Sequence, residues 1–257
     1  MIRNIDFSMY SAIKIGPRAD VFVIDEEKGD YSAYQIIGKS NNIILRDNHP
    51  PLAMLGKSFS YIHENEGKLF IGGATPNGKI FSFCKKNDIR HFEYARSLPG
   101  SLGGMVKMNA GMKQYEIFNH LLAVKTTHGY TDKKDIKHSY RHTDLQDIIY
   151  EAVFTCERGF REENVAGFAQ MRKNQPQIPS AGSCFKNPKD DFAGRLIEAV
   201  GLRGHKIGNM SFSEHHANFL VNLGGGTSQD AIALIELAIR QVQDKFNTLL
   251  EPEIVII

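Results

Sequence analysis

Short apolar runs separated by turn-forming residues dominate the first part of the chain. Runs of this kind are typical of β-strands. One helical pattern stands among them, at 80–87, which Pro76 or Asn77 can begin and Asn87 and Asp88 can end. Strands are predicted at 19–24, 43–45, 68–71, 122–127, 148–155 and, at the end of the sequence, 253–257.

The pattern becomes more helical after residue 161. Residues 192–200 predict a helix that Gly201 closes, and Ser228 is expected to cap a longer helix at 231–246. The longer helix should pack on a sheet through an apolar stripe of Ile232, Ile235, Leu237, Ile239, Val242 and Phe246. Strands and helices together, with a change of character near residue 160, predict an α+β fold with an N-terminal and a C-terminal portion.

Composition and charge narrow the class of protein. The 257 residues suffice for two or three small domains, and 42% hydrophobic with 23% charged residues is ordinary for a globular protein in water. A formal net charge of +2 argues against nucleic acid as a partner, because such binding needs a large basic surface. No apolar run approaches the length of about eighteen residues that a spanning helix needs, so no membrane insertion is expected. Asp6 interrupts the apolar core that a signal peptide requires, which predicts a cytoplasmic location.

Cysteine and histidine spacing predicts no metal site. Cys84, Cys156 and Cys184 are odd in number and form no CxxC pair, so we expect reduced thiols. The ten histidines show no HExxH spacing. The adjacent His215 and His216 would point to opposite faces of a strand and would not share an ion.

The most distinctive segment is residues 98–111, LPGSLGGMVKMNAG, which is rich in glycine. Glycines permit positive φ and allow another group to approach the backbone closely, and successive backbone N–H groups can bind a diphosphate. The segment has neither the Gly-Lys-Ser/Thr ending of a Walker A loop nor a GxGxxG turn. A tight structural loop is the alternative interpretation.

Three further polar segments are candidates for chemistry. Arg141 lies in 139–143, and Ser183 lies in a turn between two prolines with Lys186 and Asn187. The hydroxyl, ammonium and amide groups of that turn can bind phosphate or sugar oxygens. Glu253 begins the last apolar strand and so has reason to face a site. A solvated arginine, a simple β-turn and a solvated glutamate are the structural alternatives.

In this order, the segments resemble the UDP-N-acetylenolpyruvoylglucosamine reductase family over nearly the whole chain. The matching segments are 15–20 (IGPRAD), 36–45 (IIGKSNNIIL), 71–74 (IGGA), 98–104, 108–111 (MNAG), 140–141 (YR), 180–188 (SAGSCFKNP), 193–198 (AGRLIE), 213–222 (SEHHANFLVN) and 250–254 (LEPEI). The chain length resembles the shorter family type, which lacks an insertion in the substrate domain. Lys39 and Ser40 depart from the pattern because they stand where the first flavin loop has glycines, and Thr143 stands where the family has serine.

The resemblance implies an α+β fold with a pair of FAD-binding domains of the vanillyl-alcohol-oxidase/PCMH-like kind and a C-terminal α+β substrate-binding domain. The expected boundaries are 1–46 with 250–257 for the first FAD-binding subdomain, 47–160 for the second, and 161–249 for the substrate domain. The last strand is expected to return to the N-terminal part. A monomer is expected.

The resemblance also implies a chemistry. Non-covalent FAD and the co-substrate NADPH would reduce the enolpyruvyl ether of a UDP-sugar to a lactyl group, as in peptidoglycan synthesis. Arg141 would stabilise the negative charge formed on the substrate carboxylate, Glu253 would polarise that carboxylate, and Ser183 would donate the proton to carbon. Two other functions stay open: a sugar or alcohol oxidase on the same flavin-binding architecture, and a catalytically silent regulator that binds a flavin or nucleotide sugar.

By this resemblance the remaining site residues fall into two sets. Cofactor binding is expected from Gly38, Lys39, Ser40, Asn41, Asn42, Gly73, Ala74, Pro99, Gly100, Ser101, Gly103, Gly104, Asn109 and Gly111. Substrate binding is expected from Tyr140, Lys186, Asn187, His216 and Asn218.

Overall fold

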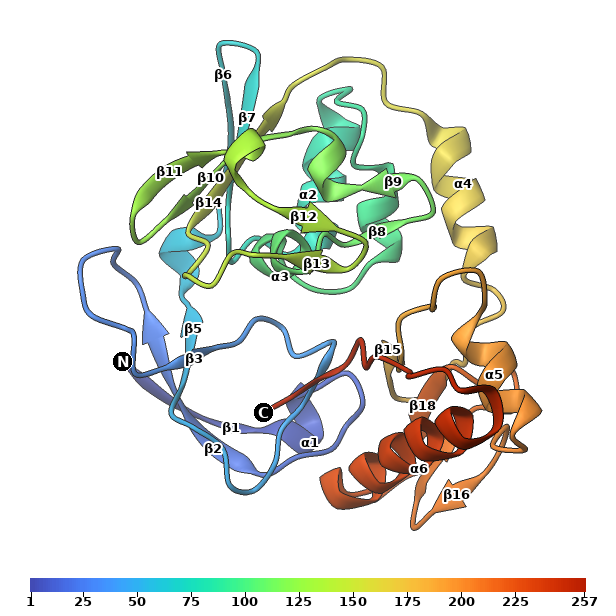
Figure 1. The fold of residues 1–257 in the computed structure, drawn as a ribbon. Helices are drawn as coiled ribbons and strands as arrows, with labels where there is room; N and C mark the ends of the chain where they lie inside the picture. The colour runs from blue at the N-terminus through green and yellow to red at the C-terminus, as the bar shows by residue number, and fades with distance from the viewer. The chain divides into compact units, whose positions relative to one another are not determined.

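A computed structural model describes residues 1–257 and divides them into two compact units. Unit 1 comprises Met1–Arg3, Val21–Lys39 and Pro51–Lys173, and unit 2 comprises Asn4–Asp20, Ser40–Pro50 and Asn174–Ile257. The strands β1 (Ile2–Asp6) and β2 (Arg18–Ile24) each have residues in both units. Figure 1 traces the chain from one end to the other.

Unit 1 is built around a five-stranded sheet with the order β11-β10-β14-β7-β6. Its neighbouring strands are all antiparallel, and the register pairs Glu151 with Gly72 and Thr155 with Lys68. Strands β6 and β7 form a hairpin at one end of the sheet (Figure 1). The strands are β6 (Ile62–Asn65), β7 (Lys68–Gly72), β10 (Leu121–Thr126), β11 (Gly129–Asp132) and β14 (Glu151–Thr155).

Helices and short strands complete unit 1. Leu69, Val124 and Phe154 of the sheet share one buried core with Ile80 of α2 and Val106 of α3. The helices are α2 (Asn77–Lys86), α3 (Leu102–Lys107) and α4 (Glu162–Met171), with 3₁₀ turns η1 (Lys57–Phe59), η2 (Glu93–Ser97), η3 (Ile117–Asn119) and η4 (Lys133–Asp135). The remaining strands are β3 (Gln35–Ile36) and β5 (Leu52–Leu55), which pair in parallel, and the antiparallel pairs β8 (Gly111–Met112) with β9 (Tyr115–Glu116) and β12 (His138–Ser139) with β13 (His142–Thr143).

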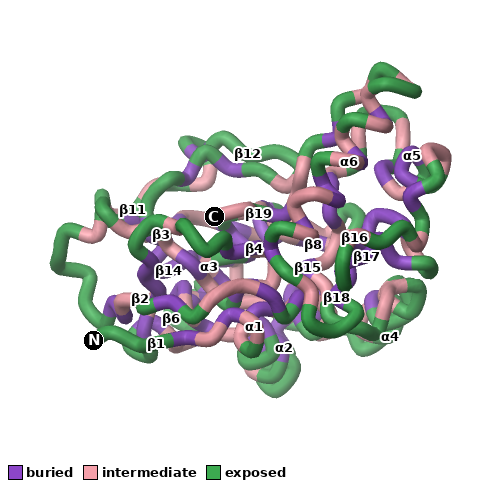
Figure 2. Tube along the Cα trace, turned by 90° about the horizontal axis from the view of Figure 1, so that it is seen from below, coloured by how far each residue is buried: buried purple, intermediate pink, exposed green.

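Unit 2 contains an antiparallel sheet with the order β15-β18-β17-β16 and a second core. The long helix contacts β16 and β17 and buries one face while its other face is exposed (Figure 2). The last strand pairs in parallel with β4, with Val255 opposite Ile43, which confirms the predicted return of the chain end. The elements are α1 (Phe7–Tyr10), β4 (Ile43–Ile44), β15 (Ser180–Ser183), α5 (Ala193–Ala199), β16 (Lys206–Ile207), β17 (Met210–Phe212), β18 (Phe219–Asn222), α6 (Ser228–Phe246) and β19 (Val255–Ile256).

The predicted elements all exist, but four details were wrong. The strand predicted from 148 begins only at Glu151. The last strand, predicted at 253–257, comprises only Val255–Ile256, so Glu253 precedes it instead of beginning it. The α6 cap is Thr227, whose backbone is extended and whose hydroxyl accepts from the Asp230 N–H at 3.1 Å, so Ser228 is already helical. His215 lies outside the strands, in the loop before β18.

The buried stripe of α6 also differs from the predicted one. It consists of Ala231, Leu234, Ile235, Ala238 and Val242, whereas Ile232, Leu237, Ile239 and Phe246 are only partly buried. A hydropathy pattern undervalues alanine, whose small side chain lets a helix approach a sheet closely. None of the helices combines the length and the apolar character needed to cross a membrane.

Candidate active site

The glycine-rich segment of unit 1 is bound along its length to the segment that follows β7. Gly103 N–H donates to the Gly73 carbonyl at 2.9 Å, and Leu102 N–H donates to the Thr75 carbonyl at 3.0 Å. Asn77 holds the segment from the other side, because its backbone N–H donates to the Gly100 carbonyl at 3.1 Å and its side-chain amide to the Leu98 carbonyl at 2.9 Å. The structure therefore brings predicted cofactor-binding residues from two distant segments together.

Close backbone packing explains several of these glycines without any ligand. A Cβ atom on Gly73 would lie 2.0 Å from the Ile149 carbonyl oxygen, and one on Gly111 would lie 2.1 Å from the Tyr115 carbonyl oxygen. A Cβ atom on Gly103 would meet the Gly73 oxygen at 3.2 Å. At these positions, the alternative of a tight structural loop accounts for the glycine.

Gly104 differs from the other glycines of the loop. It is exposed in the first turn of α3, and a Cβ atom there would have no neighbour within 4 Å. Gly38, in the first predicted flavin loop, lies close to the glycine-rich segment. A Cβ atom added at Gly38 would lie 3.2 Å from the Ser101 hydroxyl oxygen. Glycine at 104 has no packing reason in the protein itself, and the open space beside it makes this position a candidate for close approach by a cofactor.

Ser40 marks the point where this sequence departs from the family pattern. Its φ is +51°, a left-handed value that glycine adopts easily and serine rarely. The side chain is only 2% exposed, and its hydroxyl has no hydrogen-bond partner in the protein. A buried hydroxyl without a partner costs roughly 1–3 kcal/mol, so this atom is a candidate to bind an oxygen of a cofactor.

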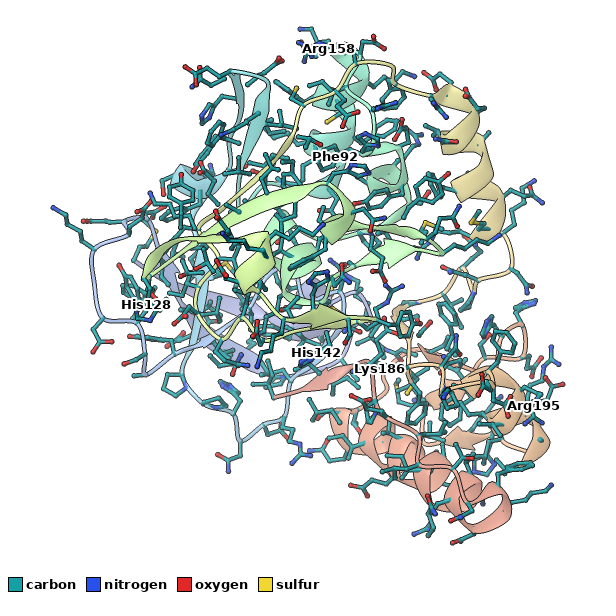
Figure 3. All side chains as sticks on the ribbon, turned by 45° about the horizontal axis from the view of Figure 1, so that its top comes forward. Phe92, His128, His142, Arg158, Lys186 and Arg195 are labelled. Carbon is teal, nitrogen blue, oxygen red and sulfur yellow. The ribbon has the colours of Figure 1, made fainter.

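Arg141 lies in the two-residue turn between β12 and β13. The next residue, His142, begins β13 and is labelled in Figure 3. The turn requires a left-handed backbone at Arg141, with φ +55°. The guanidinium donates to the Gly111 carbonyl at 2.9 Å and to the Asn109 carbonyl at 3.5 Å, and it lies 5.0 Å from the centre of the Tyr140 ring. These contacts hold a permanent positive charge against the end of the glycine-rich segment.

Asn109 stabilises the arrangement of Arg141 and the glycine-rich segment through its side-chain hydrogen bonds. It is fully buried with φ +43°, and its amide donates to Glu116 Oε2 at 2.9 Å and to the Ser139 carbonyl at 3.0 Å. Its side chain thus joins the glycine-rich segment to β9 and to the β12–β13 hairpin that carries Arg141. No role was predicted for Glu116, whose contact with Asn109 is found only in the structure.

In unit 2 the backbone holds Ser183 next to the segment of Glu253. Ser183 ends β15, and the following residue, Cys184, accepts from the Glu253 N–H at 2.8 Å. Asn42, a predicted cofactor-binding residue, donates its amide to the Glu253 carbonyl at 2.7 Å and accepts from the Val255 N–H at 3.0 Å. Two residues predicted to act together, far apart in sequence, are thereby placed on hydrogen-bonded neighbouring segments.

The four unit-2 residues predicted to bind substrate all have partners within the protein. Asn218 donates to the Phe185 carbonyl at 2.8 Å and accepts from the Phe185 N–H at 2.9 Å. Asn187 accepts from the Ala193 N–H at 3.1 Å at the start of α5, and His216 Nδ1 accepts from the Asn218 N–H at 3.3 Å. Lys186, which follows β15, donates to Glu251 Oε1 at 2.5 Å (Figure 3). Their roles toward a substrate stay predictions, while their roles in shaping the turn are observed.

Comparison with known proteins identifies close relatives over the whole chain. Residues 173–257 match the family model described as UDP-N-acetylenolpyruvoylglucosamine reductase, C-terminal domain. The protein of that name from Helicobacter hepaticus is 44% identical over 98% of both chains, and that from Campylobacter jejuni is 39% identical over 98% of this chain and 99% of its own. The crystal structure of the Thermus caldophilus reductase of this name is 26% identical and matches with a TM-score of 0.87 over 100% of this chain and 98% of its own.

Proposed function

We propose that this chain, which belongs to the UDP-N-acetylenolpyruvoylglucosamine reductase family, binds FAD without a covalent link and uses NADPH as co-substrate. With them it reduces its enolpyruvyl substrate to UDP-N-acetylmuramate. The reductase activity in peptidoglycan synthesis is that of the family, and the mixed α/β fold matches a solved member. The observation that carries the catalytic part of the proposal is the 2.8 Å hydrogen bond that holds the Glu253 segment beside the end of β15, where Ser183 lies.

The residues present suit a flavin nucleotide. Gly104 leaves open space above the first turn of α3, and the buried Ser40 hydroxyl lacks a partner in the protein. Backbone N–H groups of the glycine-rich segment that are not bound to protein carbonyls would hold the diphosphate. The Ser40 hydroxyl would donate to an oxygen of the cofactor. When bound, FAD supplies the transfer of a hydride from NADPH to the substrate.

Arg141 would stabilise charge during the reduction. Addition of a hydride to the terminal carbon of the enol ether leaves negative charge on the neighbouring carbon and on the adjacent carboxylate. A guanidinium stays protonated and binds a carboxylate with paired N–H donors. The contacts of Arg141 with the Gly111 carbonyl and the Tyr140 ring hold it in one orientation, which limits the reorganisation needed during the reaction.

Ser183 would complete the reaction by donating its proton to the charged carbon. A hydroxyl is a weak acid in water, but a carbanion-like carbon is basic enough to accept its proton. Glu253 would polarise the substrate carboxylate through a shared proton, because two ionised carboxylates repel each other. The rigid turn after β15 holds the donor in place, since Asn218 pairs both backbone polar groups of Phe185.

The proposal extends to organisation and location. The parallel pairing of β19 with β4 supports a first FAD-binding subdomain made of 1–46 and 250–257, with 47–160 as the second and 161–249 as the substrate domain. The substrate is a small UDP-sugar enolpyruvyl ether, and the enzyme acts as a cytoplasmic monomer.

Two matched glycine variants test the cofactor part of the proposal. Gly104 in α3 and Gly167 in α4 are both exposed helical glycines with no atom within 4 Å of an added Cβ. Alanine at either position should stabilise the apoprotein by about 0.5–1 kcal/mol through helix propensity. Only Gly104→Ala should weaken FAD binding, by about tenfold or more in a fluorescence titration. Parent FAD affinity in Gly104→Ala, with the expected gain in stability, would exclude this loop from the cofactor site.

A further inference from the structure

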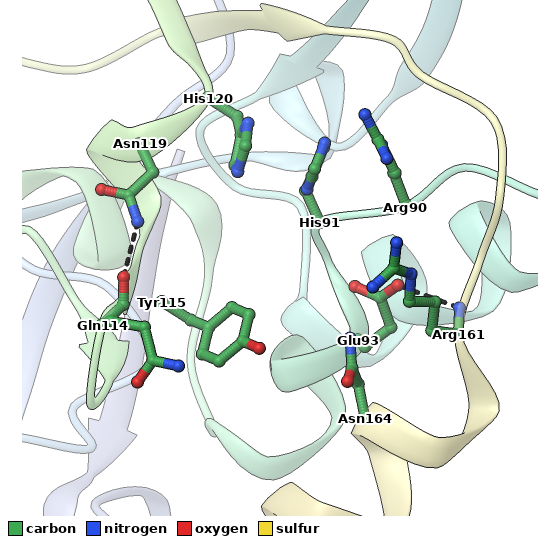
Figure 4. Close-up of a pocket in the computed structure, with 9 residues that line it drawn as sticks. All are labelled: Arg90, His91, Glu93, Gln114, Tyr115, Asn119, His120, Arg161 and Asn164. Atoms are coloured by element: carbon green, nitrogen blue, oxygen red, sulfur yellow. Dashed lines mark hydrogen bonds between the residues drawn. The ribbon is translucent and has the colours of Figure 1, made fainter.

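A polar pocket in unit 1 uses none of the residues proposed for the reaction. It has a volume of about 300 Å³, and His91, His120, Arg90 and Arg161 are among the side chains that line it (Figure 4). Glu157 lies beside it and contacts both Arg90 and His91. The ring of His91 faces the ring of His120 across a short gap (Figure 4).

The two imidazoles and the carboxylate have the spacing of metal ligands. One ligand atom from each of His91, His120 and Glu157 lies within 4.8 Å of the other two. His91 Nε2 is buried without a hydrogen-bond partner and lies 3.5 Å from Glu157 Oε2. Ligands with bonds of 2.0–2.2 Å around a tetrahedral ion are about 3.3–3.5 Å apart, so this distance fits two neighbouring corners of the tetrahedron.

Backbone hydrogen bonds fix the three segments that carry these side chains. Arg90 N–H donates to the Glu157 carbonyl at 2.9 Å, and Thr155 N–H donates to the His120 carbonyl at 3.0 Å. His91 has φ +82°, a left-handed backbone that is uncommon outside glycine and clusters at functional sites. The segments would keep their places if the side chains moved.

The imidazole rings of His91 and His120 are stacked in the metal-free protein, with ring centres 3.4 Å apart and planes at 12°. Burial lowers the pKa of both histidines.

We propose that His91, His120 and Glu157 bind one divalent transition-metal ion of the Zn²⁺ class, with a water molecule of the pocket as the fourth ligand. Two parallel rings cannot both direct a nitrogen at one ion, so the His120 ring must rotate about its Cβ–Cγ bond on binding. The Arg90 guanidinium contacts Glu157 Oε2, so it competes with a metal ion for this carboxylate oxygen. The ion must displace this guanidinium, which makes Arg90 a residue that lowers metal affinity.

The test is calorimetric titration of the full chain, first treated with a chelator, with ZnCl₂. The parent should bind one equivalent. His91→Asn, chosen because asparagine tolerates positive φ, and His120→Gln should each weaken this binding by tenfold or more. Arg90→Gln should strengthen it. His63→Gln is the matched control, because His63 is exposed and stacks on Phe70 with ring centres 4.9 Å apart.

Three results would overturn the proposal: no binding by the parent, parent affinity in both His91→Asn and His120→Gln, or an equal loss in His63→Gln. Weaker binding in Arg90→Gln would also contradict it, since removal of a competing charge can only help a cation. Thermal melts of each variant without metal establish that it is folded. Because the reaction does not use these residues, parent reductase activity in the histidine variants would leave this test unaffected.

Discussion

Asn218→Ala should remove the clamp that holds the turn carrying Ser183. The Asn218 side chain is 4% exposed, and its amide forms two hydrogen bonds with the backbone of Phe185, at 2.8 and 2.9 Å. Alanine would leave a buried N–H and a buried carbonyl unpaired. Each such group costs about 1–3 kcal/mol, so the free energy of unfolding should fall by about 2–6 kcal/mol.

Urea unfolding followed by circular dichroism measures this loss. The expected loss corresponds to a fall in Tm of roughly 4–24 °C for a chain of this size. Asn4→Ala is the matched control in the same unit, because Asn4 is exposed and bonds only to Asp20 at 2.8 Å. Its effect should stay within about 0.5 kcal/mol. Asn218→Asp, which keeps an acceptor and loses the donor, should lie between parent and alanine.

An Asn218→Ala variant whose free energy of unfolding lies within about 1 kcal/mol of the parent would contradict this prediction. Such a result would mean that Phe185 finds other partners or water once the amide is gone. Reductase turnover should fall together with stability, since Ser183 lies two residues before Phe185.

Other predictions address the reaction, the cofactor and alkaline stability. Ser183→Ala should leave flavin reduction by NADPH nearly unchanged but slow re-oxidation by the enolpyruvyl substrate by about 10²–10⁴-fold, and stopped-flow absorbance that shows re-oxidation within a few-fold of the parent would remove Ser183 as the donor. Acid precipitation should release all the yellow colour, because the proposed flavin binding is non-covalent, and colour that stays in the pellet would contradict this. Tyr130 donates to Glu151 Oε1 at 2.5 Å, and burial together with this bond raises the pKa of Tyr130 to about 12. The unfolded state therefore loses this proton first, near pH 10, and the free energy of unfolding should fall from about pH 10 to about 12. The urea midpoints measured at about pH 9 and 11 should differ less in Tyr130→Phe than in the parent. An equal difference in both proteins would refute the assignment to Tyr130.

Local signals predicted the elements of this fold well. Pro76 favours the start of a helix and Asn87 its end, and α2 begins directly after Pro76 and ends directly before Asn87. The return of the last strand to β4 followed from the family resemblance rather than from any local pattern. The buried stripe of α6 was predicted less well, because hydropathy alone cannot rank alanine against isoleucine at a close helix–sheet contact.

The roles of polar residues were the hardest to predict. Asn109 and Asn218 were expected to bind ligands, and the structure gives both of them backbone partners. A side-chain amide can hydrogen-bond to a ligand or to a backbone carbonyl equally well, and the sequence does not show which of the two lies close to it. The ligand spacing of His91 and Glu157 was likewise invisible, because it depends on hydrogen bonds between segments far apart in the chain.

We propose that this chain passes a hydride from NADPH, through a bound flavin, to an enolpyruvyl ether. The most direct measurement is an anaerobic titration of the purified, flavin-loaded protein, followed by its visible absorbance. NADPH should bleach the yellow colour, and one equivalent of UDP-N-acetylglucosamine-enolpyruvate should restore it while one equivalent of UDP-N-acetylmuramate forms. Colour that returns only on admission of oxygen, with the enolpyruvyl compound unchanged, would contradict the account.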